Sequence, residues 1–198
     1  GELNLDEQEM KTVARDGAQW ARRRGKASDD DLERTEEGGR IDNADPEIVS
    51  HKATQRGTDQ VGTLGSGNHF LEVEVVDEIY HDEAARRMGL EEGMLTVMIH
   101  TGSRGYGHQI CTEFVDEFQD VMHEYGIDLP DRQLVCAPMD SEPGQRYLAA
   151  MNCAANYAFA NRQVIADLTR QAFREIFRNR ADDYDLRQVY DIAHNMGK

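Results

Sequence analysis

The pattern of hydrophobic and polar positions predicts helices in the first third of the chain. Residues 5–24 place apolar side chains at helical spacing, with acidic residues early and arginines late, as a helix dipole favours. Residues 25–45 are charged and rich in glycine, which predicts a loop with one short turn. Asp45 and Pro46 predict the start of a short helix through about Arg56, because proline is favourable at the first helical position.

The middle of the chain predicts two strands with a helix between them. Residues 69–79 alternate aliphatic side chains with polar or aromatic ones, which is the period of a strand. An acidic helix is expected near residues 82–88. Residues 94–100, MLTVMIH, form a nearly continuous apolar run, which is typical of a strand buried on both faces.

The remaining residues predict two long helices and two more strands. The helices are expected at about 108–125 and 142–179, the second with one break, and the strands at 133–138 and 186–195. The chain contains no internal repeat and no low-complexity linker. The sequence therefore predicts one unit of α+β structure.

Composition narrows the class of protein. With 198 residues, 39% of them hydrophobic, the chain can bury a sizeable core. It has no apolar run long enough to span a membrane and no signal-peptide pattern at its start, so we expect no membrane contact and a cytoplasmic location. The chain has three cysteines, Cys111, Cys136 and Cys153, at widely spaced positions. Their odd number and wide spacing predict reduced core residues and no disulfide framework.

The net charge of -16 is spread along the whole chain, and lysine is scarce beside arginine. Such a charge repels phosphate at long range, which argues against a nonspecific nucleic-acid binder but leaves room for a local arginine site. A diffusely acidic, lysine-poor surface is also typical of proteins that work in concentrated salt, where charges are screened over short distances. A halophilic source is therefore a hypothesis.

Three histidines occupy similar positions at predicted strand ends. His69 lies where a glycine-rich loop enters a strand, while His100 and His194 lie where hydrophobic strands end. Ends of buried strands gather around a common cleft, so the three imidazoles are candidates for one metal site. Neutral imidazole suits Mn, Fe, Co, Ni and Zn, so ligand type alone does not choose the metal. The alternative is that each is a half-buried side chain satisfied by hydrogen bonds.

Glycines and arginines adjoin these histidines. Residues 65–67, Gly-Ser-Gly, are either a tight turn that needs positive φ or a loop whose backbone N–H groups approach a phosphate. Arg104, inside a second glycine-containing loop, carries the guanidinium best shaped for bidentate phosphate binding. Arg56 is either a second phosphate ligand or a surface residue. Glu72 is either solvated or an acceptor for the paired N–H donors of a guanine edge.

Four segments together resemble RtcB-type RNA ligases, in that family's order: GTLGSGNHFLEVEVVDEI, VMIHTGSRGYGHQI, SEPGQRYLAAMNCAANYAFANRQVI and VYDIAHNMGK. The resemblance covers essentially the whole chain, and its GSGNHF and HTGSRG motifs are highly specific. It implies an enzyme that joins an RNA 3′-phosphate or 2′,3′-cyclic phosphate to a 5′-hydroxyl, as in tRNA splicing, with GTP and two Mn²⁺ ions. It also implies an α+β fold of mixed β-sheets with flanking helices.

The resemblance assigns roles residue by residue. The family's metal-binding histidines are matched by His69, His100 and His194. Its GTP-binding residues are matched by Asn68, Phe70, Glu72 and Asn195. Its RNA phosphate-binding residues are matched by Arg56, Arg104 and Asn68.

Two features of the family have no counterpart in the chain. These are an upstream D-x-x-C motif, whose cysteine bridges the metals, and the downstream histidine that is guanylylated, so no catalytic nucleophile is expected before Lys198. In the complete enzyme that histidine attacks the GTP α-phosphate, the guanylate passes to the RNA 3′-phosphate, and the 5′-hydroxyl displaces it. Residues 1–198 are therefore expected to be the central part of a single ligase domain, inactive alone. Need for an accessory protein is left open.

Two rival interpretations use the same residues. A metal-dependent phosphoesterase built on the three histidines would release phosphate with Mn²⁺ and without GTP. A non-catalytic binding or structural fragment would use them only for core hydrogen bonds, and removing His69 and His100 would then leave metal affinity unchanged.

Overall fold

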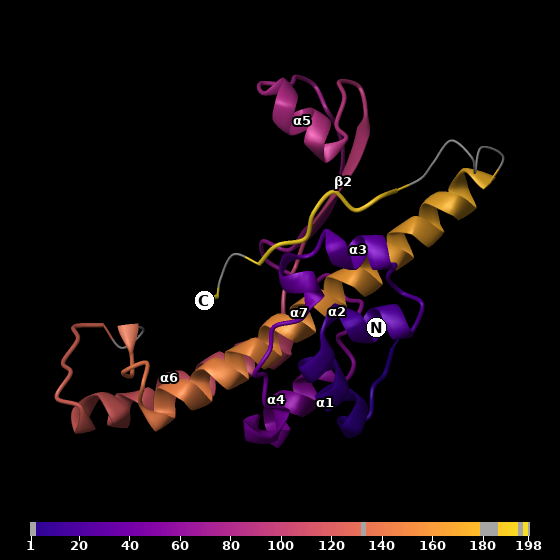
Figure 1. Ribbon diagram of the computed structural model, residues 1–198. Helices are drawn as coiled ribbons and strands as arrows, with labels where there is room; N and C mark the ends of the chain where they lie inside the picture. The colour runs from indigo at the N-terminus through magenta and orange to yellow at the C-terminus, as the bar shows by residue number, and fades with distance from the viewer. Residues whose placement is uncertain (1–2, 132–133, 179–185, 194–195, 198) are drawn as a thin grey trace.

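The computed structural model describes residues 3–131, 134–178, 186–193 and 196–197. Within these ranges a helical body carries a projecting β-hairpin, and Figure 1 shows the hairpin rising from one side of the helices. The longest helix, α7 (Glu142–Ile176), has 35 residues and a length of about 52 Å. Helices α1, α2 and α6 pack along it, so α7 is the axis of the helical body.

The N-terminal helix predicted at 5–24 is divided into α1 (Glu7–Asp16) and α2 (Ala18–Arg23). The break lies at Gly17, which has a φ of 54°. A Cβ at this position would overlap the carbonyl oxygen of Gly39, so the chain can turn here only at a residue without a side chain.

The segment predicted as a loop with one turn contains two short elements, α3 (Asp29–Glu33) and the 3-10 helix η1 (Glu36–Gly39). The helix predicted from Pro46 is also divided, into the 3-10 helix η2 (Pro46–Ile48) and α4 (His51–Gly57). The division follows from Ser50, whose hydroxyl accepts a hydrogen bond from the Ala53 N–H and so starts a new helix.

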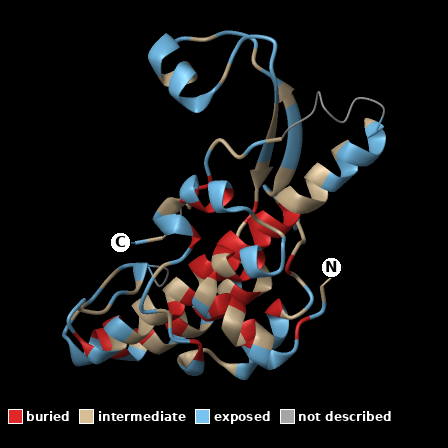
Figure 2. Cartoon of the chain, turned by 45° about the vertical axis from the view of Figure 1, so that its right-hand side comes forward, coloured by how far each residue is buried: buried red, intermediate tan, exposed pale blue. Residues whose placement is uncertain are grey.

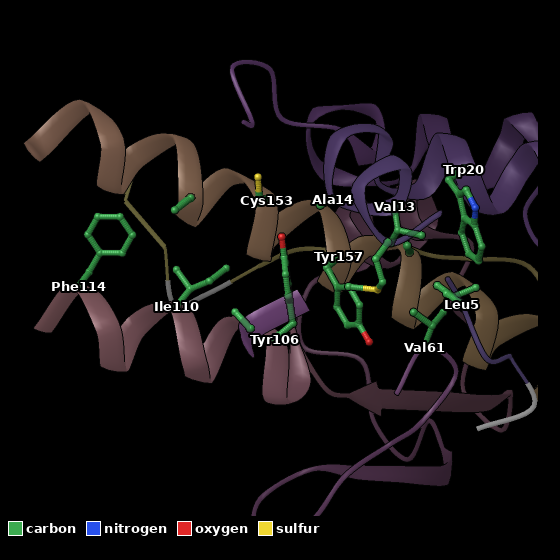
Figure 3. Close-up of a cluster of buried hydrophobic side chains, with 14 of the residues drawn as sticks. Leu5, Val13, Ala14, Trp20, Val61, Tyr106, Ile110, Phe114, Cys153 and Tyr157 are labelled. Carbon is green, nitrogen blue, oxygen red and sulfur yellow. The ribbon is translucent and has the colours of Figure 1, made fainter. Parts of the chain in front are cut away.

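The core lies between α6 (Arg104–Glu124), α7 and the N-terminal helices. Figure 3 shows α6 side chains, among them Tyr106 and Ile110, facing Cys153 and Tyr157 of α7. Each large side chain buried in this way contributes about 1.5–3 kcal/mol to stability. Figure 2 shows that the buried residues gather in this body and not in the hairpin. The two long helices predicted from the sequence are confirmed, although α7 runs without the expected break.

The hairpin pairs β1 (Phe70–Val75) with β2 (Leu95–His100) in antiparallel register, from Phe70 opposite His100 to Val75 opposite Leu95. Helix α5 (Asp82–Met88) lies in the connection, as predicted. The expectation that β2 is buried on both faces is wrong, because β1 is its only partner strand among the described residues and neither face is covered. On opposite faces of β2, Leu95 is 46% exposed and Met98 is 45% exposed.

The predicted strands at 133–138 and 186–195 do not form in the parts of these ranges that the structure describes. Residues 186–193 instead lie against α3 and α7 and make a single isolated β-bridge, between Thr35 and Asp191. Their other contacts use side chains, such as the Arg170 guanidinium, which donates to the Leu186 carbonyl. The α+β class is confirmed, with a small antiparallel sheet.

The burial of the cysteines differs from the expectation that all three are core residues. Only Cys153 is buried, while Cys111 and Cys136 are exposed. Burial raises the pKa of the Cys153 thiol to about 12.

Among the described residues, none of the helices is both long enough and apolar enough for a membrane crossing.

Candidate functional site

The base of the hairpin brings two of the predicted histidines together. Phe70 and His100 are the last pair of the ladder, and His69 immediately precedes that pair. The ring centroids of His69 and His100 are 6.3 Å apart, and those of Phe70 and His100 are 5.0 Å apart in an edge-to-face arrangement. The antiparallel register therefore fixes both imidazoles at the end of the sheet that faces the helical body.

The hydrogen bond of His69 selects its tautomer. Its Nδ1 lies 2.8 Å from the carbonyl oxygen of Ser66, which can only accept, so Nδ1 carries the proton. Arg104 Nη1 is 3.5 Å from the same nitrogen, and two donors do not bond each other. The lone pair of His69 is then on Nε2, the arrangement that metal-binding histidines commonly show when the other ring nitrogen donates to a carbonyl.

The two imidazoles have the donor atoms that a shared metal ion requires. With metal–nitrogen bonds of about 2.1 Å, two imidazoles on one ion place their ring centroids roughly 5–6 Å apart, close to the distance between His69 and His100. Among the described residues, no group of three or more His, Cys, Asp or Glu side chains is gathered as a metal site. His194, the third predicted ligand, lies outside the described residues, as does Asn195.

Arg104 begins α6 beside the glycine loop. Its Nε donates to Thr63 Oγ1 at 3.3 Å, and its guanidinium lies against Gly65 so closely that a Cβ there would overlap it. Gly65 has a φ of 111° and Gly67 one of 77°, so the loop is a turn with positive φ. Arg104 itself has a φ of 53°, a conformation that is rare for a residue with a side chain.

Arg56 lies on the other side of the α6 N-terminus. Its Nη1 donates to Gln109 Oε1 at 2.9 Å, and Gln109 Nε2 donates to Glu113 at 2.9 Å. A Cβ on Gly105 would crowd Arg56, so glycine allows the close approach here as well. Two guanidinium groups therefore lie near the N-terminus of a 21-residue helix, and the positive charge of both and the helix dipole favour an anion.

These groups open onto a cleft of about 1750 Å³ between the hairpin, α7 and the segment 186–193. Its described lining includes eight arginines but only two carboxylates, Glu74 and Asp191, although the chain as a whole carries a charge of -16. The predicted site residues that line it are Arg56, Asn68, His69, His100 and Arg104. Phe70 and Glu72 do not line it, although they share one face of the sheet with His100.

The sequence reasoning missed a polar cluster on α7. Asn161, Arg162 and Gln163 are buried. Asn161 and Arg162 bond to the loops that carry the site, whereas Gln163 donates to Gln188 and to Asp191 of the segment 186–193. Arg162 Nε donates to Asp191 Oδ1 at 2.6 Å and its Nη1 donates to the carbonyl of Thr101 at 3.3 Å. Burial raises the pKa of Asp191, and the Arg162 guanidinium opposes that shift. The available signal was a run of three polar residues that directly follows an almost wholly apolar part of a long helix.

Comparison with known proteins identifies the relatives of the chain. Residues 1–198 match the family described as tRNA-splicing ligase RtcB. Over 198 residues the chain is 48% identical to the tRNA-splicing ligase RtcB of Archaeoglobus fulgidus, covering 100% of this chain and 41% of that protein. The Thermococcus kodakarensis ligase gives the same values. The Pyrococcus abyssi ligase is 50% identical over 198 residues, or 22% of its length. The chain thus spans about two fifths or less of the length of these curated relatives.

Proposed function

The chain belongs to the tRNA-splicing ligase RtcB family, and on this premise we propose that it forms part of the active site of an RNA ligase. The reaction joins an RNA 3′-phosphate or 2′,3′-cyclic phosphate to a 5′-hydroxyl, with GTP and Mn²⁺. The observation that carries the proposal is the convergence of His69, His100 and Arg104 at the base of the hairpin.

The histidines are the proposed metal ligands. His69, through Nε2, and His100 would hold Mn²⁺, with His194 as the third ligand. Bound there, the metal would neutralise the charge of crowded phosphates and polarise the phosphate under attack. The Ser66 carbonyl supports this role because it keeps the proton on Nδ1 of His69.

The arginines are the proposed phosphate ligands. Arg104 and Arg56 border the N-terminus of α6, where backbone N–H groups and two guanidinium groups can orient the RNA 3′-phosphate. Asn68, exposed beside His69, adds an amide donor to the same position. Their work is to bind and orient the phosphate, which is most of what a protein contributes to phosphoryl transfer.

The guanine pocket is proposed from the sheet face next to His100. Phe70 and Glu72 lie on that face, and the Glu72 carboxylate can accept both N–H donors of a guanine edge. Asn195 completes this proposed GTP-binding set.

The nucleophile of the reaction is proposed to lie outside residues 1–198, so that this chain is the central part of one ligase domain. The proposed partners are RNA ends, GTP and an activating accessory protein. The proposed location is the cytoplasm.

The test uses the full-length protein that contains these residues. Wild type, His100→Ala and the control His123→Ala would receive RNA with 3′-phosphate and 5′-hydroxyl ends, GTP and MnCl₂. His123 is exposed near the far end of α6, so its removal should leave ligation unchanged. We expect His100→Ala to lower the ligation rate at least about 100-fold.

Three other results would contradict the proposal in different ways. Phosphate release with Mn²⁺ and no GTP would favour the phosphoesterase. Unchanged Mn²⁺ affinity after removal of His69 and His100 would favour a binding fragment. Covalent guanylate on the 198-residue chain alone would place the nucleophile within it and make the exposed cleft residue His108 the first variant to test.

A further inference from the structure

Two asparagine side chains of α7 are completely buried in the helical body. Asn156 and Asn161 each have 0% exposure. A buried amide destabilises a protein unless its donors and acceptor are satisfied, so each must have a structural partner. Both amides bond to backbone groups far away in the sequence, but they hold different parts of the molecule.

Asn161 joins the two loops that carry the proposed site. Its Oδ1 accepts from the backbone N–H of Gly62 at 2.8 Å and of Thr63 at 3.2 Å. Its Nδ2 donates to the carbonyl of Thr63 at 3.2 Å and to that of Gly102 at 3.1 Å. One side chain thus bonds to the loop before His69 and to the loop after His100.

A second bond joins the same two loops directly. The hydroxyl of Thr101 donates to the carbonyl of Leu64 at 2.6 Å, and Asn161 Nδ2 lies 3.5 Å from that hydroxyl oxygen. The loop that leaves β2 and the loop that enters β1 are therefore fastened at their base, on the α7 side of the imidazoles.

Asn156 makes an equivalent set of bonds away from the site. Its Oδ1 accepts from the Ile41 N–H at 2.7 Å, and its Nδ2 donates to the carbonyls of Ala14, Arg15 and Ile41 at 3.0–3.2 Å. It fastens the end of α1 to the segment after η1. The two residues match in type, helix, burial and bonding, and differ in what they hold.

We infer that Asn161 is a positioning residue that sets the separation of His69 and His100 by tying their loops to α7. Only an amide provides an acceptor for two N–H groups and donors for two carbonyls from one position. Aspartate lacks the donors and alanine lacks both. The consequence for metal binding rests on the proposed function, whereas the consequence for loop order does not.

The test compares Asn161→Ala with Asn156→Ala in the full-length protein. Hydrogen exchange followed by mass spectrometry would be measured for peptides covering residues 60–65 and 38–43, together with thermal unfolding and Mn²⁺ affinity by calorimetry. Both variants should lose thermal stability by similar amounts. Asn161→Ala should speed exchange in 60–65 only, and Asn156→Ala in 38–43 only.

Metal affinity separates a positioning role from a merely structural one. Asn161→Ala should weaken Mn²⁺ binding about 10–100-fold, as loss of groups that orient metal ligands typically does, while Asn156→Ala should leave it within about twofold of wild type. Thr101→Val, nearly isosteric, removes the direct bond between the loops and the 3.5 Å contact of the hydroxyl with Asn161, but keeps the bonds of Asn161 to the backbone of both loops. This variant should also weaken Mn²⁺ binding, by a smaller factor than Asn161→Ala. If Asn161→Ala does not fold, Thr101→Val replaces it in the test.

The outcomes distinguish this inference from the proposed function. Equal losses of Mn²⁺ affinity in the two asparagine variants, no loss in Asn161→Ala, or no faster exchange at 60–65 would overturn the positioning role. If wild type binds no Mn²⁺, the proposed function fails, and the exchange pattern alone then decides whether Asn161 orders the two loops.

Discussion

Arg104 holds a left-handed backbone conformation at the first residue of α6. A φ of 53° on a residue with a side chain costs about 1–3 kcal/mol, which the surrounding contacts must offset. The guanidinium contacts Thr63 and lies against Gly65, so the strained backbone aims it at the loop that carries His69. Any energetic cost is thus incurred at the position where the proposed phosphate binds.

Replacing Arg104 with glycine should separate stability from binding. Arg104→Gly relieves the strain, so we expect a melting temperature equal to or above that of Arg104→Ala, which keeps it. Both variants lose the guanidinium, and affinity for RNA with a 3′-phosphate should fall at least about 10-fold. Thermal unfolding and RNA binding in the full-length protein measure the two effects. A glycine variant less stable than the alanine variant would show that the backbone is not strained.

Single residues differ in how well the sequence predicts them. His69 and His100 were placed together because each stands at the end of a recognisable strand, and the antiparallel register brought those ends into one pair. The role of Asn161 was not predictable, because its partners are 59 to 99 residues away and its value depends on loops meeting at α7. From sequence alone, a polar residue in a helix is predicted to be exposed, and only the positions of its neighbours show that it is buried.

Among the elements, α3 is fastened to α7 by one carboxylate. Asp31 is 4% exposed, accepts from Ser28 in a capping box and receives two hydrogen bonds from Arg170, at 2.6 and 3.1 Å. Burial by itself raises the pKa of Asp31, but the bonds from Arg170 and Ser28 outweigh it and the pKa lies below its ordinary value. The folded state therefore favours the ionised carboxylate.

This lowered pKa predicts a pH-dependent loss of stability. The contribution of Asp31 is fully present above the ordinary pKa of about 3.9 and is lost as pH falls through the lower folded value. Asp31→Asn should lower the free energy of unfolding by about 2–4 kcal/mol at pH 7, and by less at pH 3.5 and below. Urea unfolding at several pH values measures the difference, with the exposed Asp30→Asn as control. A difference independent of pH would contradict the assignment.

Helices were predicted better than strands for a physical reason. The helical period and the caps are local, so α5, α6 and α7 were found, whereas the break at Gly17 depends on contact with Gly39. Strands depend on partners elsewhere in the chain, and the sequence predicted strands at both 94–100 and 186–195. Only the first formed a ladder, because β1 lies beside it. Residues 186–193 are held by one isolated bridge at Asp191 and by side chains such as those of Gln188 and Arg170.

For the whole molecule, the charge distribution is uneven. Acidic residues outnumber basic ones by 38 to 22, yet the cleft has arginines on several sides. Several of these arginines are paired with carboxylates, such as Arg34 with Asp30 and Arg87 with Glu83. The acidic charge therefore lies mainly outside the cleft, where it repels itself across the surface of the body.

Salt should consequently stabilise the fold. Raising KCl from about 0.1 to 1 M shortens the screening length from about 10 to 3 Å and weakens this repulsion, so we expect the melting temperature to rise. Thermal unfolding by circular dichroism at a series of KCl concentrations measures it. Sucrose at matched osmolality controls for effects of solute exclusion, because it does not screen charge. A flat or falling dependence would remove the support for a halophilic source.

The outer end of the hairpin, which carries α5, lies away from the base, which carries the imidazoles of His69 and His100. Helix α5 has no buried residue and packs on no other helix or strand of the described chain, as its position in Figure 1 shows. The ladder has six residue pairs, and its outermost pair, Val75 and Leu95, is about 17 Å from the pair that contains His100. Residues 77–81, which lie at this outer end and do not line the cleft, are therefore a natural place for a protein engineer to insert a fluorescent reporter or an affinity tag, since the ladder separates the insertion from the imidazoles.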